Sequence, residues 1–367
     1  MGMNTTISEP TIGPGPPAEP GPAEDALLAR YQALAASDSI RWAAQYRKIR
    51  LLGKGGQGVV YLSERQGTDL FRLPVAIKIF SPEQYRDAAS YDEDMARIAD
   101  ITSRVAMVQH DNLIDLHNFI AHDGIRVMVM EWVDGYDLRT LLTAQTLERT
   151  QARLSPERWQ HVSQVILADG PYQPRLKPGV AIQVLRACLA GLAALHRDGI
   201  VHGDLKPANI MVKRTGNAKI IDIGSAMDIG KARRRRMWSP TYAAPEVLAG
   251  GETTPHADLA SLGYILVEML AGQCPFEGID ERRTLLEAKL QFEQRLKEIL
   301  PPEVVANDLL MYICHKLTAA NPNKRFASAQ AADLGRKGAA AFHRQLVKGD
   351  LASEYENDLR NWLEELD

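Results

Sequence analysis

The 367-residue sequence has only three cysteines and a net charge of only −3 at pH 7. Three widely spaced cysteines give no disulfide or zinc-binding pattern, so we expect a reducing, cytoplasmic setting. The nearly balanced charge does not favour nucleic acid or a membrane surface as the main partner. The chain does not open with a basic region followed by an apolar one, and no uninterrupted apolar run reaches the roughly 18 residues of a membrane span. We therefore expect no signal peptide and no membrane-spanning segment.

The composition is that of a globular protein preceded by a poorly structured segment. Apolar residues make up 45% of the chain and charged residues 24%, and the length allows two lobes with substantial cores. Residues 1–24 are rich in proline and glycine, so we predict a disordered tail there. Residues 25–45 contain leucine and tyrosine at helical spacing, which predicts a short helical extension.

One stretch carries the strongest chemical signal. Asp204 and Asn209 lie in a loop after an apolar helical run, with Lys206 between them, and Asp222 follows thirteen residues after Asn209. The first carboxylate is suited to orienting a hydroxyl group, and the amide and second carboxylate are suited to holding Mg²⁺ on phosphates. A solvated loop could carry the same residue types, but the Lys-Pro-x-Asn spacing and the downstream Asp-x-Gly favour phosphoryl transfer.

A glycine-rich segment lies near the start of the globular part. Gly53, Gly55 and Gly58 form G-x-G-x-x-G, in which glycine lets backbone N–H groups approach phosphates closely. A dinucleotide-binding fold would require a helix directly afterwards, whereas residues 59–62 resemble a strand. The segment is not a phosphate-binding loop of the Walker type, because no Lys-Ser or Lys-Thr follows the last glycine. A lone lysine, Lys78, then occurs in an apolar strand.

Taken together, these motifs resemble those of eukaryotic-like protein kinases, in the bacterial Ser/Thr form. The resemblance extends from about Tyr46 to Leu346 and includes Ala-Pro-Glu ending at Glu246, an aspartate at 258 that opens an apolar helix, and Arg325. It implies an α+β, bilobal, protein-kinase-like fold, with a small antiparallel β lobe carrying one main helix and a larger, mainly helical lobe. The implied organisation is a small lobe over 46–133, a large lobe over 134–346, an insertion over 144–178, and an acidic helical tail over 347–367.

The resemblance also implies ATP and Mg²⁺ as cofactors and protein Ser/Thr hydroxyls as substrate. Asp204 would orient the hydroxyl, Lys206 would neutralise developing charge, and Asn209 and Asp222 would hold Mg²⁺. Glu246 and Arg325 would form a structural pair, and Asp258 would hold the backbone of the catalytic loop. The nucleotide site would comprise Gly53, Lys54, Gly55, Gly58, Val60, Ala76, Lys78, Met130, Glu131, Val133, Asp137 and Met211.

The partner of Lys78 is the least defined part of the predicted site. Protein kinases pair this lysine with a glutamate on the following helix, which is expected here over residues 91–108. Glu93 lies fifteen residues after Lys78 and Asp100 lies twenty-two after it. We prefer Glu93 as the catalytic partner for its length and spacing, while each carboxylate is equally suited to an exposed helix face.

Three positions depart from the kinase pattern, and two other functions stay open. Gly203 replaces the usual arginine before the catalytic aspartate, Ile223 replaces the usual phenylalanine, and Ser239 replaces a threonine. A small-molecule phosphotransferase of the aminoglycoside or choline kinase type carries His-Gly-Asp as here but lacks the glycine loop and the Ala-Pro-Glu. A pseudokinase scaffold would have lost a catalytic group, and none is missing. The physiological substrate and the oligomeric state are not indicated by the sequence.

Overall fold

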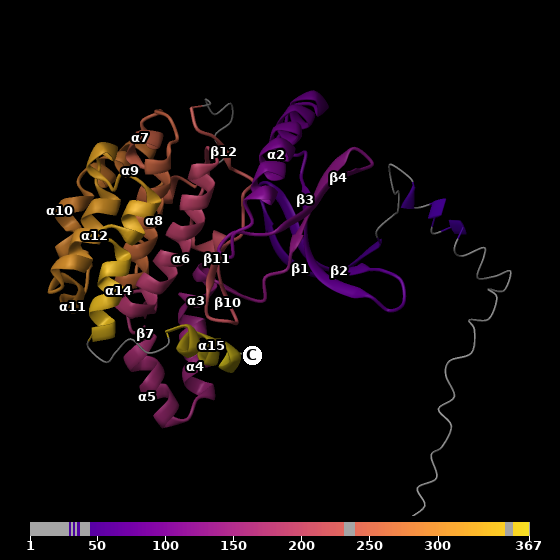
Figure 1. The fold of residues 1–367 in the computed structure, drawn as a ribbon. Helices are drawn as coiled ribbons and strands as arrows, with labels where there is room; N and C mark the ends of the chain where they lie inside the picture. Colours follow the sequence, from indigo (N-terminus) through magenta and orange to yellow (C-terminus); the bar gives the residue numbers. More distant parts are fainter. Residues whose placement is uncertain are drawn as a thin grey trace, which may run out of the picture. The chain divides into compact units, whose positions relative to one another are not determined.

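A computed structural model of the chain describes residues 29–30, 32–33, 35–36, 45–230, 239–348 and 355–366. Tyr46–Arg65 together with Arg72–Asp367 forms one compact unit (Figure 1). Of the predicted extension over 25–45, residues 29–30, 32–33 and 35 are helical. The predicted disordered tail over 1–24 lies outside the described residues.

The small lobe is built on an antiparallel sheet with strand order β1-β2-β3-β5-β4. Side chains of a strand point alternately to its two faces, and this alternation places Lys78. Ala76 and Phe80 of β3 face the main core, and Val75 and Ile77 pack on the opposite face. Lys78 therefore shares the inner face. The strands are β1 Gln45–Gly55, β2 Gly58–Gln66, β3 Arg72–Phe80, β4 Leu116–His122 and β5 Ile125–Glu131.

One long helix, α2 Ala88–Val108, packs against β4 in this lobe. It begins at Asp87, whose carboxylate accepts a hydrogen bond of 2.7 Å from Ser90 N, an N-cap that satisfies an otherwise unpaired backbone donor. It ends at Gln109 in the left-handed conformation. The helix buries one face at helical spacing, consisting of Tyr91, Met95, Ile98, Ile101, Thr102 and Val105.

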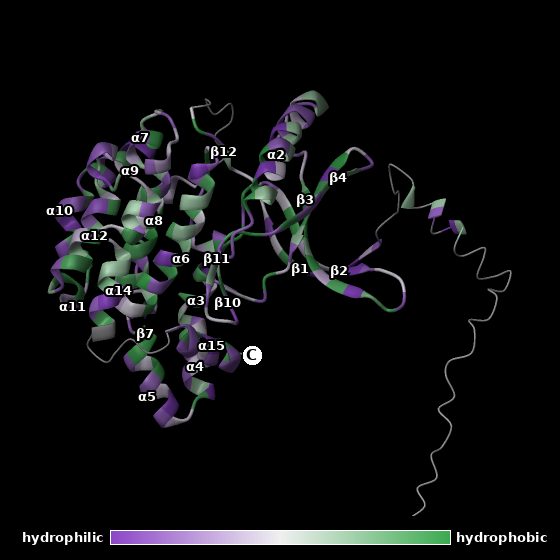
Figure 2. Cartoon of the chain, in the orientation of Figure 1, coloured by the Kyte–Doolittle hydropathy of each residue, from purple (hydrophilic) through white to green (hydrophobic). Residues whose placement is uncertain are grey.

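The large lobe is organised around two helices, α6 Pro178–Arg197 and α8 Pro255–Ala271. Every residue of α8 from Ala257 to Ala271 is buried, as expected for a helix surrounded by protein. The colours of Figure 2 agree with this arrangement, because α8 is mostly apolar whereas α10 is mostly hydrophilic. The surrounding helices are α3 Leu138–Leu141, α7 Pro245–Leu248, α9 Arg282–Leu290, α10 Phe292–Ile299, α11 Pro302–Val305, α12 Asp308–Thr318, α13 Ala329–Leu334 and α14 Ala339–Lys348.

Among the described residues, α6 alone has the length and composition to cross a membrane. Its most apolar window is 67% buried inside the protein, which is what the core helix of a folded lobe shows. Its apolar character is thus accounted for by packing in this lobe.

Short strands and 3₁₀ turns position the connecting loops of the large lobe. The hairpin of β10 and β11 extends to β6, and β9 pairs with β12. These elements are β6 Gly135–Asp137, β9 Ile200–Val201, η1 Pro207–Asn209, β10 Ile210–Lys213, β11 Ala218–Ile220, β12 Met227–Asp228, η2 Pro240–Tyr242 and η3 Pro322–Lys324.

The insertion over 144–178 contacts the C-terminal helix, α15 Tyr355–Glu365, which also packs on α6. Trp362 of α15 is fully buried, and its Nε1–H donates to Thr150 Oγ1 at 3.2 Å. Arg158 and His161 pair with Glu365 and Asp358 at 2.8 and 2.9 Å. The helix α15 is therefore part of the packed lobe. The insertion comprises α4 Ala144–Arg153, α5 Pro156–Val165, β7 Leu167–Ala168 and β8 Arg175–Leu176.

Thr150→Val is expected to destabilise the protein by about 1–3 kcal/mol, because the buried Trp362 Nε1–H loses its acceptor. Thr150 is fully buried on α4, so water does not replace the lost oxygen. Chemical denaturation of the variant checks the value. Gln151→Ala, an exposed change at the next position, is the control and should stay near the wild type. A variant as stable as wild type would show that the tryptophan needs no partner there.

Candidate active site

A cavity of about 770 Å³ lies between the five-stranded sheet and the loops of the large lobe. Its walls come from the β1–β2 turn, β3, β5, β6, the η1 region and the segment after β11. Every residue predicted from the sequence for the site lines this cavity, with the exception of Glu93. The structure therefore brings together groups from positions 53 to 222 in one cleft.

The three glycines of the G-x-G-x-x-G motif, which flank the β1–β2 turn, fall into two kinds. Gly58 has φ +133°, and an added Cβ would lie 2.0 Å from the carbonyl oxygen of Ile79, so the fold itself requires glycine there. An added Cβ at Gly53 or Gly55 would meet nothing within 4 Å. The fold does not require glycine at these two positions. The empty space beside them allows a ligand such as a phosphate group to approach the backbone closely.

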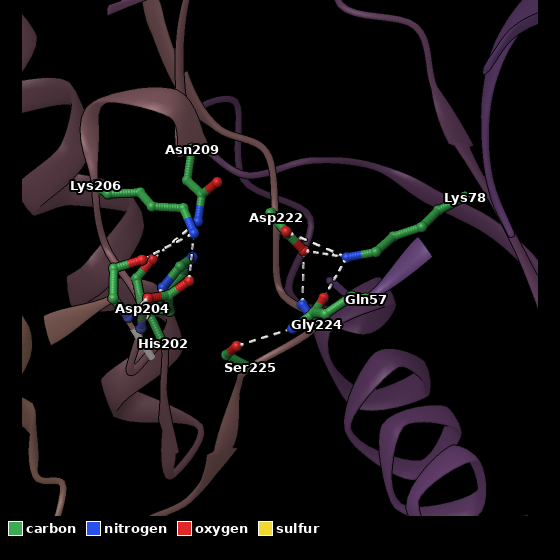
Figure 3. Close-up of polar contacts among 10 residues, drawn as sticks. Gln57, Lys78, His202, Asp204, Lys206, Asn209, Asp222, Gly224 and Ser225 are labelled. Carbon is green, nitrogen blue, oxygen red and sulfur yellow. Dashed lines mark hydrogen bonds and ion pairs between the residues drawn. The ribbon is translucent and has the colours of Figure 1, made fainter. Parts of the chain in front are cut away.

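Lys78 and Asp222 form an ion pair inside the cavity (Figure 3). Lys78 Nζ lies 2.9 Å from Oδ1 and 3.2 Å from Oδ2 of Asp222, and Gly224 N donates to Oδ1 at 2.9 Å. Burial alone raises the pKa of Asp222, but the nearby Lys78 ammonium and the Gly224 N–H lower that pKa to about 2. Asp222 is therefore ionised at neutral pH, as a metal-binding carboxylate must be.

The register of the β10–β11 hairpin brings Asn209 beside Asp222. Ile210 is paired with Ile220, and Ile221 N donates to the carbonyl oxygen of Asn209 at 3.0 Å. The Asn209 amide nitrogen donates to the carbonyl oxygen of Asp204 at 2.8 Å, which leaves the amide oxygen as an acceptor toward the cavity (Figure 3). An amide oxygen and an ionised carboxylate lie on one wall as a result.

Asp204 is held from two sides by the adjacent loop residues. Its Oδ2 accepts a hydrogen bond from Lys206 Nζ at 2.8 Å, and its Oδ1 accepts one from Ser239 N at 2.6 Å. Lys206 Nζ also donates to Ser239 Oγ at 3.1 Å. The carboxylate, the ammonium and the hydroxyl therefore form one cluster that fixes the orientation of Asp204. Figure 3 shows the contact between Asp204 and Lys206.

Asp258, at the start of α8, anchors the backbone of this loop. Its carboxylate accepts hydrogen bonds from His202 N at 2.9 Å, Gly203 N at 2.8 Å and His196 Nε2 at 2.8 Å. This confirms the role predicted for Asp258. Burial lowers the pKa of His202, so its imidazole is neutral at physiological pH. Gly203 has φ +74°, a conformation that glycine adopts without strain.

The structure does not bring Glu93 to Lys78, and the expectation of that pair is not met. The buried face of α2 contains Tyr91 and Met95, and the helical period places Glu93 and Asp100 on exposed positions. Burial of the apolar side chains decided which face points inward. In the described part of the chain, the polar partners of Lys78 are Asp222 and a residue that the sequence did not single out, Gln57.

Two predicted nucleotide contacts have structural partners of their own. The Glu131 carboxylate accepts a hydrogen bond from Asp115 N at 2.7 Å and pairs with the buried Lys219. The Asp137 carboxylate caps α3, accepting hydrogen bonds from Thr140 N at 3.0 Å and Thr140 Oγ1 at 2.8 Å. Both residues line the cavity, and their contacts to adenine and ribose stay predictions.

The donor set fits Mg²⁺ bound together with phosphates. The described residues contain no cluster of three or more His, Cys, Asp or Glu side chains arranged to hold a metal. Asn209 and Asp222 supply two oxygen ligands. Mg²⁺ is commonly bound by one or two protein carboxylates together with water and substrate phosphates, and this wall offers that number.

Comparison with known proteins identifies the family to which these residues belong. Residues 46–334 match the family model of the protein kinase domain. The chain is 28% identical over 297 residues to the serine/threonine-protein kinase PrkC of Bacillus subtilis, covering 79% of this chain and 40% of that protein. It is 32% identical over 288 residues to PknD of Mycobacterium tuberculosis, covering 77% and 38%, and 30% identical over 247 residues to PkaB of Streptomyces coelicolor, covering 64% and 50%. The chain thus spans no more than half the length of these relatives.

Proposed function

Because the chain belongs to the protein kinase family, we propose that it transfers the γ-phosphoryl group of ATP, with Mg²⁺, to serine or threonine hydroxyls of proteins. One observation carries the proposal. The Asp204 cluster and the Lys78–Asp222 pair line the same cavity, with Asn209 between the two groups (Figure 3). A hydroxyl-orienting carboxylate and a set of phosphate-binding groups are thereby combined in one site.

In this reaction the charge of each site residue determines its role. Asp204 accepts a hydrogen bond from the substrate hydroxyl and orients its oxygen toward the phosphoryl group. Lys206, held beside Asp204, stabilises the negative charge that develops on the transferred group. Lys78 contributes a buried positive charge for the phosphates of the nucleotide. Mg²⁺, held by Asn209 and Asp222, neutralises further phosphate charge when it is bound.

Two features support a protein hydroxyl over a small alcohol. Ser239, which leads into the segment ending at Glu246, contacts both Asp204 and Lys206. That segment is fixed to the large lobe by Glu246 and Arg325, which form the structural pair predicted from the sequence. The named relatives are serine/threonine-protein kinases, which favours serine and threonine over tyrosine.

The cysteines support the proposal of a reducing, cytoplasmic setting. All three are free thiols, and burial raises the pKa of Cys188 and Cys314 to about 12 and that of Cys274 to about 11. Thiols with such pKa values are protonated at neutral pH and react slowly.

The experiment that tests the function follows radiolabelled ATP. The purified protein is incubated with Mg²⁺ and labelled ATP in the presence of either a generic protein substrate or a mixture of small alcohols such as choline and aminoglycosides. We expect label on serine and threonine of protein, and none when the metal is chelated. Label only on small alcohols would replace the proposal with the small-molecule phosphotransferase. ATP binding without any transfer would replace it with a pseudokinase scaffold.

A further inference from the structure

The active-site lysine is buried, and two polar groups of the described residues set its orientation. Lys78 is 5% exposed, and its Nζ donates to Asp222 and to Gln57 among the described residues. Asp222 is also the proposed ligand of Mg²⁺, so its oxygens are shared once metal and nucleotide are present. Gln57 is then the partner of Lys78 that does not compete with the metal.

Gln57 lies in the β1–β2 turn and is fixed there by contacts to distant parts of the chain (Figure 3). Its Oε1 accepts the hydrogen bond from Lys78 Nζ at 2.6 Å, and its Nε2 donates to Ser225 Oγ at 3.2 Å. Its carbonyl oxygen accepts from Ser81 N at 3.0 Å, which ties the turn to the end of β3, the strand of Lys78. Both the amide and the backbone of Gln57 are therefore positioned relative to the lysine.

The helix that would supply a carboxylate presents an apolar face instead. The buried residues of α2 are five hydrophobic side chains and Thr102, and its carboxylates at 93 and 100 are exposed. We propose that Gln57 is a positioning residue that holds Lys78 for the nucleotide phosphates, in the place of a carboxylate from α2. This inference rests on the proposed phosphotransfer function.

The chemistry of the amide suits this role. A carboxylate partner orients an ammonium group but also compensates its charge, whereas the Gln57 oxygen is a neutral acceptor. The hydrogen bond to a charged donor is among the stronger ones in proteins, so it restricts the lysine well. The positive charge of Lys78 is then not reduced further by Gln57, and because the Lys78 side chain is only 7% exposed, its interactions with the phosphates are strong.

The test measures nucleotide binding by titration calorimetry in the presence of Mg²⁺. Gln57→Ala is expected to weaken ATP binding about tenfold, the effect of losing one charge-assisted hydrogen bond. Adenosine lacks the phosphates, so its affinity is expected to be unchanged in this variant. Gln57→Glu keeps an acceptor oxygen but compensates part of the Lys78 charge, so its ATP affinity is expected to lie between those of Gln57→Ala and wild type, and the KM for ATP should follow the same order.

Gln330→Ala is the matched control, because Gln330 is an exposed glutamine of α13 that does not line the cavity. It is expected to leave ATP binding unchanged. Equal or tighter ATP binding by Gln57→Ala would show that the side chain obstructs the site, and equal losses for ATP and adenosine would show a purely structural role. A Gln57→Glu variant as weak as Gln57→Ala would also overturn the inference. These titrations do not require transfer, so a wild-type protein that binds ATP without transferring it would overturn the proposed function alone.

Discussion

Asp204→Asn is expected to reduce phosphoryl transfer by about 10³-fold, in line with the loss of other electrostatic groups that act on a transition state. The asparagine oxygen keeps one of the two contacts, to Ser239 N or to Lys206 Nζ, whereas the asparagine NH2 group accepts neither. What is lost is the negative charge that orients the substrate hydroxyl and receives its proton. The variant should therefore fold, bind ATP and transfer almost nothing.

The measurement is the initial rate of label incorporation at saturating ATP, with ATP affinity and melting temperature recorded on the same preparation. Asp198→Asn is the matched control, because it makes the same change of charge outside the cavity. Asp198 is an exposed aspartate at the end of α6. It should retain the wild-type rate. A folded Asp204→Asn variant with near wild-type turnover would remove Asp204 from the mechanism.

Glu246→Ala is expected to destabilise the protein by about 3–5 kcal/mol, because it leaves a buried arginine without its counter-charge. The Arg325 side chain is 0% exposed and forms a two-pronged pair with Glu246, at 2.6 and 2.8 Å. Its remaining hydrogen bonds go to the carbonyl oxygens of His256, Ala319 and Ala320. Carbonyl oxygens satisfy the donors but do not compensate the charge, so the penalty for burying the guanidinium remains.

Thermal and urea unfolding check this value, with Glu252→Ala as the control at an exposed position a short distance along the chain. The control should differ little from wild type. The double variant Glu246→Ala, Arg325→Met distinguishes the cause, because it removes the buried charge as well as its partner. It is expected to be more stable than Glu246→Ala alone. Equal stability of the single and double variants would show that the uncompensated charge is not the origin of the loss.

The sequence alone was sufficient wherever function depends on residue type and on spacing within one loop or one motif. The positions of Asp204, Lys206 and Asn209 are within one short turn, so their proximity follows from chain connectivity. The pairing of Glu246 with Arg325 and the anchoring role of Asp258 were predicted from motif resemblance and are confirmed by the contacts observed. The α+β fold was predicted from the same ordered motifs.

The tertiary structure alone decided the contacts that depend on which face of an element is buried. Spacing along α2 allowed either Glu93 or Asp100 to reach Lys78, but packing of Tyr91, Met95 and the apolar residues after them turned both carboxylates outward. Helix rotation is set by the total apolar area that is buried, and one ion pair is too weak to override it. The insertion gave no indication of its role because its partner, α15, lies about 200 residues away in sequence, as the 212-residue separation of Thr150 and Trp362 shows. In the same way, Gln57 meets Ser225 across 168 residues, and a contact over that separation is specified by the folded core and by no local pattern.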